Sequence, residues 1–208
     1  MRERFMKQLE LLNNLMIEMG NMIEKAISMA TEALVTKNME LAKEAIAYDE
    51  EVNNMQKEIE NLCLRLLLQQ QPVASDLRTV SAALNMITDM ERIGDHAADI
   101  SEITLLMKDT DYVANLDIIK KMAAETTYMV TKSIEAYVER DVEKAEQVIK
   151  HDDIVDDLFM QEKKNLIEQI NKSMNNGEEA ADMLMVAKYF ERIGDHATNL
   201  AERIIERQ

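Results

Sequence analysis

The chain contains one seven-residue stretch twice: Glu91-Arg92-Ile93-Gly94-Asp95-His96-Ala97 and, 100 residues later, Glu191-Arg192-Ile193-Gly194-Asp195-His196-Ala197. Upstream of these stretches the repeat continues at an offset of 103 residues. The matched pairs there are Ala33 and Ala136, Val35 and Val138, Glu40 and Glu143, Ala42 and Ala145, Asp49 and Asp152, and Val52 and Val155. A repeat of this length predicts that one structural unit occurs twice in the chain.

Each unit reads as three long helices. Apolar residues recur at helical spacing from about Phe5 to Val35, and Asn38 and Asp141 are suitable N-caps for the second helix of each half. The elements expected next in the first half are a second helix that ends before Pro72, a third helix from about Ser75 to Met107 and a linker over Lys108–Asn115. The change of offset is expected in the turn around Pro72 and in its counterpart Asn175-Asn176-Gly177, because loops tolerate insertions.

The composition agrees with an all-helical protein. There are one proline and four glycines among 208 residues, while helix-forming residues are abundant. No segment alternates between apolar and polar residues as a half-buried strand would. We therefore predict an all-α fold made of two antiparallel three-helix bundles in tandem, over residues 1–110 and 111–208.

The charge and the cysteine content restrict the setting and the partners. The chain has 40 acidic and 24 basic residues, a formal net charge of -16, and such a surface repels nucleic acid and anionic lipid. The single cysteine, Cys63, rules out an internal disulfide and fits a reducing cytosol. No apolar run approaches the roughly 20 residues of a membrane-spanning helix, and the start Met1-Arg2-Glu3-Arg4 lacks a signal peptide. We expect a cytosolic protein.

The acids of the repeated stretch lie on an apolar helix face. At 100° per residue, Glu91 and Asp95 are within about 40° of each other. The apolar residues expected on their face are Leu77, Val80, Leu84, Ile87 and Leu105. Glu191 and Asp195 are placed in the same way in the second half. Carboxylates on such a face are costly to desolvate unless protons, basic side chains or bound cations balance them.

The preceding helix of each half brings further acids on an apolar face. Asp49 is followed one turn later by Asn53, and Asp152 is followed by Asp156, so that both pairs stack on one side of their helix. A cluster of oxygen donors suits hard cations such as Mg²⁺, Mn²⁺, Ca²⁺ or iron. The predicted metal ligands are Asp49, Glu91, Asp95 and Asp99 in the first half and Asp152, Asp156, Glu191 and Asp195 in the second. Because Asn53 is neutral, the two sites are expected to hold different numbers of ions, although Asp99 can compensate.

The other positions of the repeated stretch have different expected roles. Gly94 and Gly194 lack a Cβ, which lets either a neighbouring helix or a carboxylate come close, and the sequence does not decide between the two. The histidines, His96 and His196, are expected on an outer face or in contact with the ligands, but not as ligands. The arginines point about 100° away from the acids, which predicts that they are poor partners for them.

With these features the sequence resembles the PhoU family. The resemblance covers essentially the whole chain: its length, its two three-helix halves and one copy of the ERIGDHA stretch in each third helix. Asp76-Leu77-Arg78 also resembles the pattern of the family. The resemblance implies a multinuclear metal cluster bound through E/DxxxD motifs, most often of iron, with zinc, manganese or magnesium as alternatives.

The resemblance also implies a function and partners. PhoU-like proteins are cytosolic homodimers that reach the membrane only through their partners and are not enzymes. They restrain a phosphate ABC transporter, whose ATPase subunit is one expected partner, and a sensor histidine kinase that controls phosphate-responsive genes. A regulator of phosphate homeostasis is therefore the favoured interpretation.

Two other classes of function stay open. A di-iron oxidase of the ferritin type needs Glu-x-x-His pairs, and none of His96, His151 and His196 has a glutamate three positions before it. A metal-dependent phosphate-handling enzyme would need a basic side chain beside the acids to bind the substrate anion, and none is expected there. A purely structural helical adaptor would bind no metal.

Overall fold

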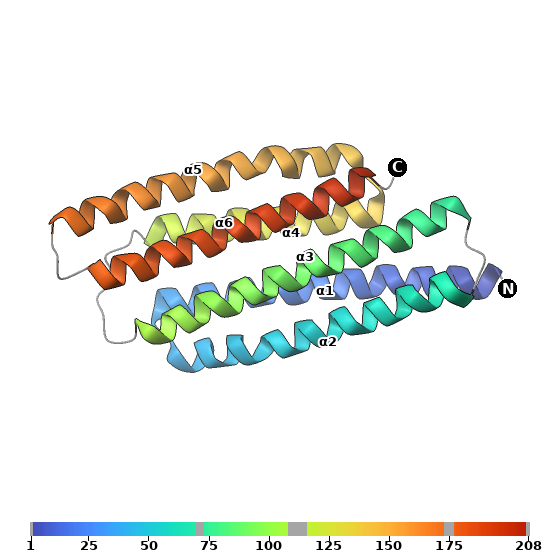
Figure 1. The fold of residues 1–208 in the computed structure, drawn as a ribbon, viewed down its shortest axis with the longest axis horizontal. Helices are drawn as coiled ribbons and strands as arrows, with labels where there is room; N and C mark the ends of the chain where they lie inside the picture. The colour runs from blue at the N-terminus through green and yellow to red at the C-terminus, as the bar shows by residue number, and fades with distance from the viewer. Residues whose placement is uncertain (1, 70–72, 108–115, 173–176, 207–208) are drawn as a thin grey trace.

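The computed structural model describes residues 2–69, 73–107, 116–172 and 177–206, and over these the chain forms six long helices. They are α1 (Arg2–Thr36), α2 (Met39–Gln69), α3 (Ala74–Leu106), α4 (Leu116–Glu139), α5 (Val142–Lys172) and α6 (Gly177–Glu206). Helices α1, α2 and α3 pack into one antiparallel bundle, and α4, α5 and α6 pack into a second one (Figure 1). The predicted all-α fold of two tandem three-helix bundles is confirmed.

The two bundles lie side by side and share one core. Helix α3 packs against α6 and α1 packs against α4, with the members of each pair running in opposite directions (Figure 1). Apolar side chains from all six helices form one buried cluster, in which methionines such as Met16, Met86 and Met183 are fully buried. The methionines are therefore mainly core residues. Leu77, expected on the apolar face of the third helix, is 45% exposed, because it lies in the first turn of α3.

The turns between the first and second helices of each half are built alike. Lys37 and Arg140 have φ angles of 53° and 59°, the left-handed conformation that ends α1 and α4. The next residues are the predicted N-caps: Asn38 Oδ1 accepts a hydrogen bond from the Leu41 amide (3.1 Å), and Asp141 Oδ1 accepts one from the Lys144 amide (3.0 Å). These two caps are confirmed.

The other predicted boundaries agree less completely. The predicted turn at Pro72, the linker Lys108–Asn115 and the division at 110/111 lie outside the described residues. Gly177, expected in the turn before the sixth helix, instead begins α6. None of the described helices combines the length and the apolar content needed to cross a membrane.

Candidate metal centre

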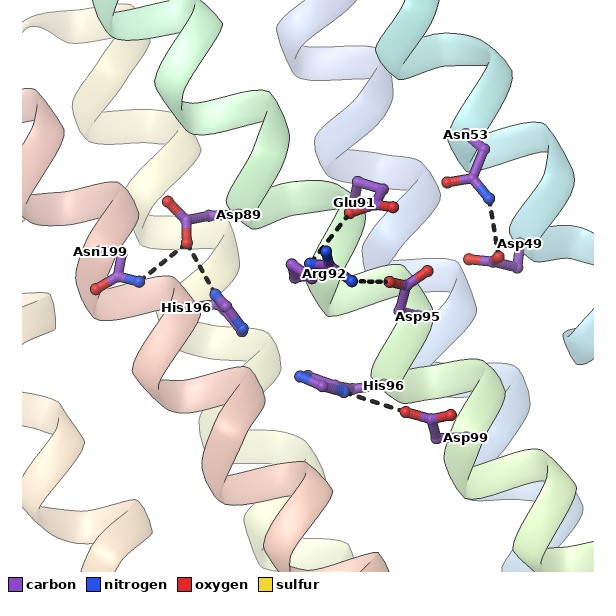
Figure 2. Close-up of polar contacts among 10 residues, drawn as sticks. All are labelled: Asp49, Asn53, Asp89, Glu91, Arg92, Asp95, His96, Asp99, His196 and Asn199. Carbon is purple, nitrogen blue, oxygen red and sulfur yellow. Dashed lines mark hydrogen bonds and ion pairs between the residues drawn. The ribbon is translucent and has the colours of Figure 1, made fainter.

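The first acid cluster consists of Asp49 on α2 and Glu91 and Asp95 on α3, which face each other across the two helices (Figure 2). Gly94 allows this approach: a Cβ there would lie 3.1 Å from Val52 Cγ1 and 3.4 Å from Asp49 Oδ1. The close helix packing against Val52 thus favours the glycine, and the Asp49 carboxylate lies at contact distance beside it. Asp49 Oδ2 accepts a hydrogen bond from Asn53 Nδ2 (3.0 Å), while Oδ1 is buried and has no hydrogen-bond donor among the described residues.

The second acid cluster repeats this arrangement with Asp152 and Asp156 on α5 and Glu191 and Asp195 on α6. A Cβ on Gly194 would lie 3.0 Å from Asp152 Oδ1. That oxygen is also buried without a hydrogen-bond donor in the described part of the chain. The same unpaired carboxylate oxygen therefore occurs at equivalent positions of both halves.

Burial and mutual repulsion favour the protonated form of several of these acids. Burial and the charges of Asp156, Asp195 and Glu191 raise the pKa of Asp152 to about 6, against a lowering by the nearby Thr198 side chain. The Thr198 hydroxyl nevertheless does not meet hydrogen-bond geometry with Asp152 Oδ1. Burial, followed by the charge of Asp95, raises the pKa of Asp49 and that of Glu91. The acids of each cluster are thus close enough to affect one another's protonation.

The acids of the second cluster that lie nearer the solvent behave alike. Burial and the charge of Glu191 raise the pKa of both Asp156 and Asp195, and Lys188 lowers both. Repulsion of this kind disfavours charged carboxylates unless positive charge is brought in.

Basic side chains do contact both clusters, which corrects the expectation that the acid faces hold none. In the first half, Arg92 Nη1 lies 2.9 Å from Asp95 Oδ2, and its Nε lies 3.7 Å from Glu91 Oε2 (Figure 2). The guanidinium reaches back over the helix surface, because a long side chain is not confined to the direction of its Cβ. Burial is the main cause that lowers the pKa of His96, and the charges of His196 and Arg192 add to it, while Asp99 raises that pKa.

In the second half the positive charge comes from Lys188, which the sequence analysis missed. Its Nζ lies 2.6 Å from Glu191 Oε1. The signal was available, since Lys188 precedes Glu191 by three residues and such pairs meet on a helix surface.

The motif histidines do not lie on an outer face, but His96 fits the other expected position, contact with a predicted ligand, because its Nδ1 lies 3.2 Å from Asp99 Oδ2. They meet at the contact between α3 and α6, where their ring centroids are 5.4 Å apart, and His96 is buried. His196 Nδ1 lies 2.8 Å from Asp89 Oδ1, which also accepts a hydrogen bond from Asn199 Nδ2 (2.9 Å) (Figure 2). The histidines therefore join the two halves, and their predicted separation from the acid face agrees with this position.

The eight predicted ligands are not all placed alike. Asp99 turns toward His96, with Oδ2 3.2 Å from Nδ1, and stands apart from the first acid cluster (Figure 2). Asp156 and Asp195 are exposed residues at the edge of the second cluster. In the described ranges, no three Asp, Glu, His or Cys side chains stand close enough together to enclose one ion. A complete coordination sphere therefore stays a prediction.

The donor chemistry of both clusters nevertheless fits hard cations. The donors are carboxylate oxygens, among which Asp49 Oδ1 and Asp152 Oδ1 are buried without a hydrogen bond to any described residue, and their like charges raise one another's pKa. A bound cation would satisfy the unpaired oxygen and remove the repulsion. The residues suited to hold it are Asp49, Glu91 and Asp95 in one half and Asp152, Asp156, Glu191 and Asp195 in the other.

Comparison with known proteins agrees with the duplicated architecture. A family model described as "PhoU domain" matches residues 16–104 and again residues 119–204. A protein of Clostridium acetobutylicum named "Phosphate-specific transport system accessory protein PhoU homolog" is 38% identical, over 98% of this chain and 94% of its own length. A protein of the same name from Borreliella burgdorferi is 32% identical, over 97% of this chain and 93% of its own.

Solved structures show the same fold. The crystal structure of PhoU from Pseudomonas aeruginosa matches with a TM-score of 0.93 at 26% identity and covers 98% of each chain. The structure of the phosphate transport system regulatory protein PhoU from Streptococcus pneumoniae matches with a TM-score of 0.90 at 27% identity, over 98% of this chain and 96% of that one.

Proposed function

The chain belongs to the PhoU family, and from this premise we propose that it is a cation-binding regulator of phosphate transport. The printed names of its relatives, accessory proteins of a phosphate-specific transport system, support the role in transport. The pairs of helices α2–α3 and α5–α6 each carry one cation-binding site in this proposal.

One observation supports cation binding above the others: Asp49 Oδ1 and Asp152 Oδ1 are buried without a hydrogen-bond donor among the described residues, at equivalent positions of the repeat. Burying an unpaired carboxylate oxygen lowers the stability of the fold. Its presence at equivalent positions of both halves supports the same function for the two clusters. The proposed cofactor is a multinuclear metal cluster, with iron first and zinc, manganese or magnesium as alternatives. When bound, the metal supplies positive charge that ties the two helices of a pair together.

The proposed action is protein contact without catalysis. Relatives carry the names of accessory and regulatory proteins, and His96 and His196 pair with Asp99 and Asp89 at the contact between the halves, outside the two acid clusters. Proposed partners are the ATPase subunit of a phosphate ABC transporter, a phosphate-sensing histidine kinase and a second copy of the chain. The proposed location is the cytosol, with the membrane reached through these partners.

Exposed apolar side chains are consistent with contacts of this kind. Leu68 at the end of α2 and Leu106 at the end of α3 are 83% and 73% exposed. Leu64 and Ile167, at equivalent positions of α2 and α5, are 44% and 46% exposed. Side chains of this type at both ends of the first bundle and along α5 offer apolar anchors for protein partners.

A metal-dependent phosphate-handling enzyme is the second candidate. The observation that favours it is the presence of Arg92 and Lys188 beside the acid clusters, since a basic side chain next to a metal suits a phosphate anion. Both side chains are already paired with carboxylates, which favours the regulatory role. Steady release of phosphate from a phosphomonoester by the Mn²⁺-loaded protein, lost in the D49N/D152N double variant, would establish the enzyme instead.

The regulatory proposal can be tested in cells that lack the chromosomal gene. The wild-type gene should restore repression of a phosphate-responsive reporter in phosphate-rich medium, and the D49N/D152N double variant should not, because both clusters lose their buried acid. E58Q, a change of an exposed glutamate on α2, is the control and should restore repression fully. Full repression by the double variant at normal protein level would contradict a role for the clusters.

A further inference from the structure

We propose that Lys188 is a built-in counter-ion of the second acid cluster, which competes with bound cations and sets the affinity of that cluster for them. The inference rests on the proposed cation binding and adds a residue that controls it. It also assigns different affinities to two sites that share the same acid at three positions.

The position of Lys188 on α6 brings its ammonium group to the acids. Nζ lies 2.6 Å from Glu191 Oε1, and the side chain of Glu191 is only 14% exposed. On its other side the ammonium lies 5.3 Å from the centre of the Phe159 ring on α5, a cation–π contact. Phe159 follows Asp156 by three residues on α5, so Lys188 spans the two helices that carry the cluster.

The charge of Lys188 also acts on acids other than Glu191, its direct partner. It lowers the pKa of both Asp156 and Asp195, against the raising effect of burial and of Glu191. A divalent cation bound by Glu191 would stand within a few ångströms of this ammonium, and like charges repel strongly at such distances. The cation must therefore displace Lys188 from Glu191, or it binds with lower affinity while the ammonium stays in place.

Phe159 contacts the ammonium group of Lys188 while that group is paired with Glu191, so the ring can keep the lysine at the site when the ion pair is broken. The lysine side chain is a flexible stem with a compact charge, and it is 38% exposed. The ring can hold the ammonium while a cation takes over Glu191, so displacement does not require the lysine to leave the site entirely. Competition of this kind lowers the affinity for a cation without abolishing binding.

The first half has neither a lysine nor an aromatic ring at the positions equivalent to Lys188 and Phe159. Thr88 stands at the position of Lys188 and Gln56 at that of Phe159, by the two offsets of the repeat. The counter-charge there is Arg92, whose guanidinium is 56% exposed and contacts Asp95 from the solvent side. The chain thus offers its own matched control, since Lys188→Thr copies the residue that the first half uses.

The test measures Mn²⁺ binding to the full-length protein by calorimetry, with one cluster disabled at a time. In the D49N background, where the second cluster remains, K188T should raise the affinity by about tenfold, and K188R, which keeps the charge, should not. In the D152N background, K188T should leave Mn²⁺ binding unchanged. The reciprocal T88K should weaken the first cluster in that background by a similar factor.

A measurement without Mn²⁺ separates competition from loss of fold. In EDTA, K188T should lower Tm by about 2–4 °C relative to K188R, because the acids lose their counter-charge, and Mn²⁺ should restore it. Equal Mn²⁺ affinities of K188T and wild type in the D49N background would overturn the role of Lys188 and leave the proposed function intact. Absence of Mn²⁺ binding in the wild type and in every variant would overturn both.

Discussion

The two halves of the molecule share three acids in the same backbone setting, Asp49 and Asp152, Glu91 and Glu191, and Asp95 and Asp195, but pair them with different basic side chains. In the first half Arg92 contacts Glu91 and Asp95 from within the repeated stretch. In the second half the ammonium group of Lys188, from outside the stretch, contacts Glu191. A stretch that is unchanged in sequence therefore does not guarantee the same contacts.

The two halves share a glycine on the third helix and a buried aspartate oxygen that packs against it. Gly94 and Gly194 both bring a carboxylate oxygen within 3.4 Å of the position of their missing Cβ, and both of those oxygens lack a donor among the described residues. The duplicated feature is thus a carboxylate held against a neighbouring helix. The counter-charge and the residue after the buried aspartate, Asn53 or Asp156, are the parts that differ between the halves, and these two differences should determine how the cation affinities of the two sites differ.

The largest expected effect comes from removing one buried acid at a time. D49N and D152N should each reduce Mn²⁺ affinity at their own cluster by on the order of a hundredfold, and each should leave the other cluster intact. Equilibrium dialysis with Mn²⁺ would measure both. Loss of all Mn²⁺ from either single variant would show that the halves do not bind independently.

A smaller effect is expected from making the clusters alike. N53D supplies the acid that the first half lacks, and D156N removes it from the second. We expect N53D to strengthen Mn²⁺ binding by about tenfold and D156N to weaken it similarly, because the number of charged ligands sets the affinity. Unchanged binding in both variants would show that the position after the buried aspartate does not take part.

The pH dependence of stability should also differ between the halves. The pKa of Asp152 is about 6 in the folded protein against 3.8 for an ordinary aspartate. Stability from this group is therefore fully present below about pH 4 and is lost as the pH rises through 6. Asp152 is only half-buried, so solvent screens its charge. We therefore expect the free energy of unfolding to fall by about 1 kcal/mol between pH 4 and pH 7.

Urea unfolding in EDTA at pH 4 and pH 7 would measure this loss, and D152N should remove it. D49N should remove a smaller part of this pH dependence. Burial and one main neighbour, Asp95, raise the pKa of Asp49, while the hydrogen bond from Asn53 lowers it. A pH dependence that is the same in wild type and D152N would assign the effect to other groups.

The smallest effect concerns a feature in which the halves agree. Lys37 and Arg140 both adopt a positive φ at the end of a helix, which glycine adopts without strain. K37G and R140G should each raise the free energy of unfolding by up to about 1 kcal/mol, by similar amounts. Thermal unfolding would measure this, and a clear difference between the two variants would show that the turns are not equivalent.

The fold was largely predictable because its signals are local. Helical periodicity, the rarity of glycine and proline and the caps at Asn38 and Asp141 each act within a few residues, and the repeat confirmed them by occurring twice. The apolar helix faces likewise placed Asp49 and Asp152 beside the third helix of each half. These acids therefore follow from sequence alone.

The contacts between helices were less predictable. The positions of His96 and His196 depend on how α3 packs against α6, which no pattern within one helix specifies. The reach of Arg92 was missed because the direction of Cβ does not fix the end of a long side chain. Lys188 lies outside the repeated stretch and has Thr88 as its counterpart, so the repeat does not point to it, although its i,i+3 spacing to Glu191 allows the contact.

The most direct measurement is anomalous diffraction from crystals of the full chain grown with limiting Mn²⁺. We predict one peak or group of peaks beside Asp49 between α2 and α3, another beside Asp152 between α5 and α6, and unequal occupancy of the two. If neither location showed a peak even with Mn²⁺ in excess, the acid clusters would be ordinary helix surfaces and the molecule a helical scaffold without metal.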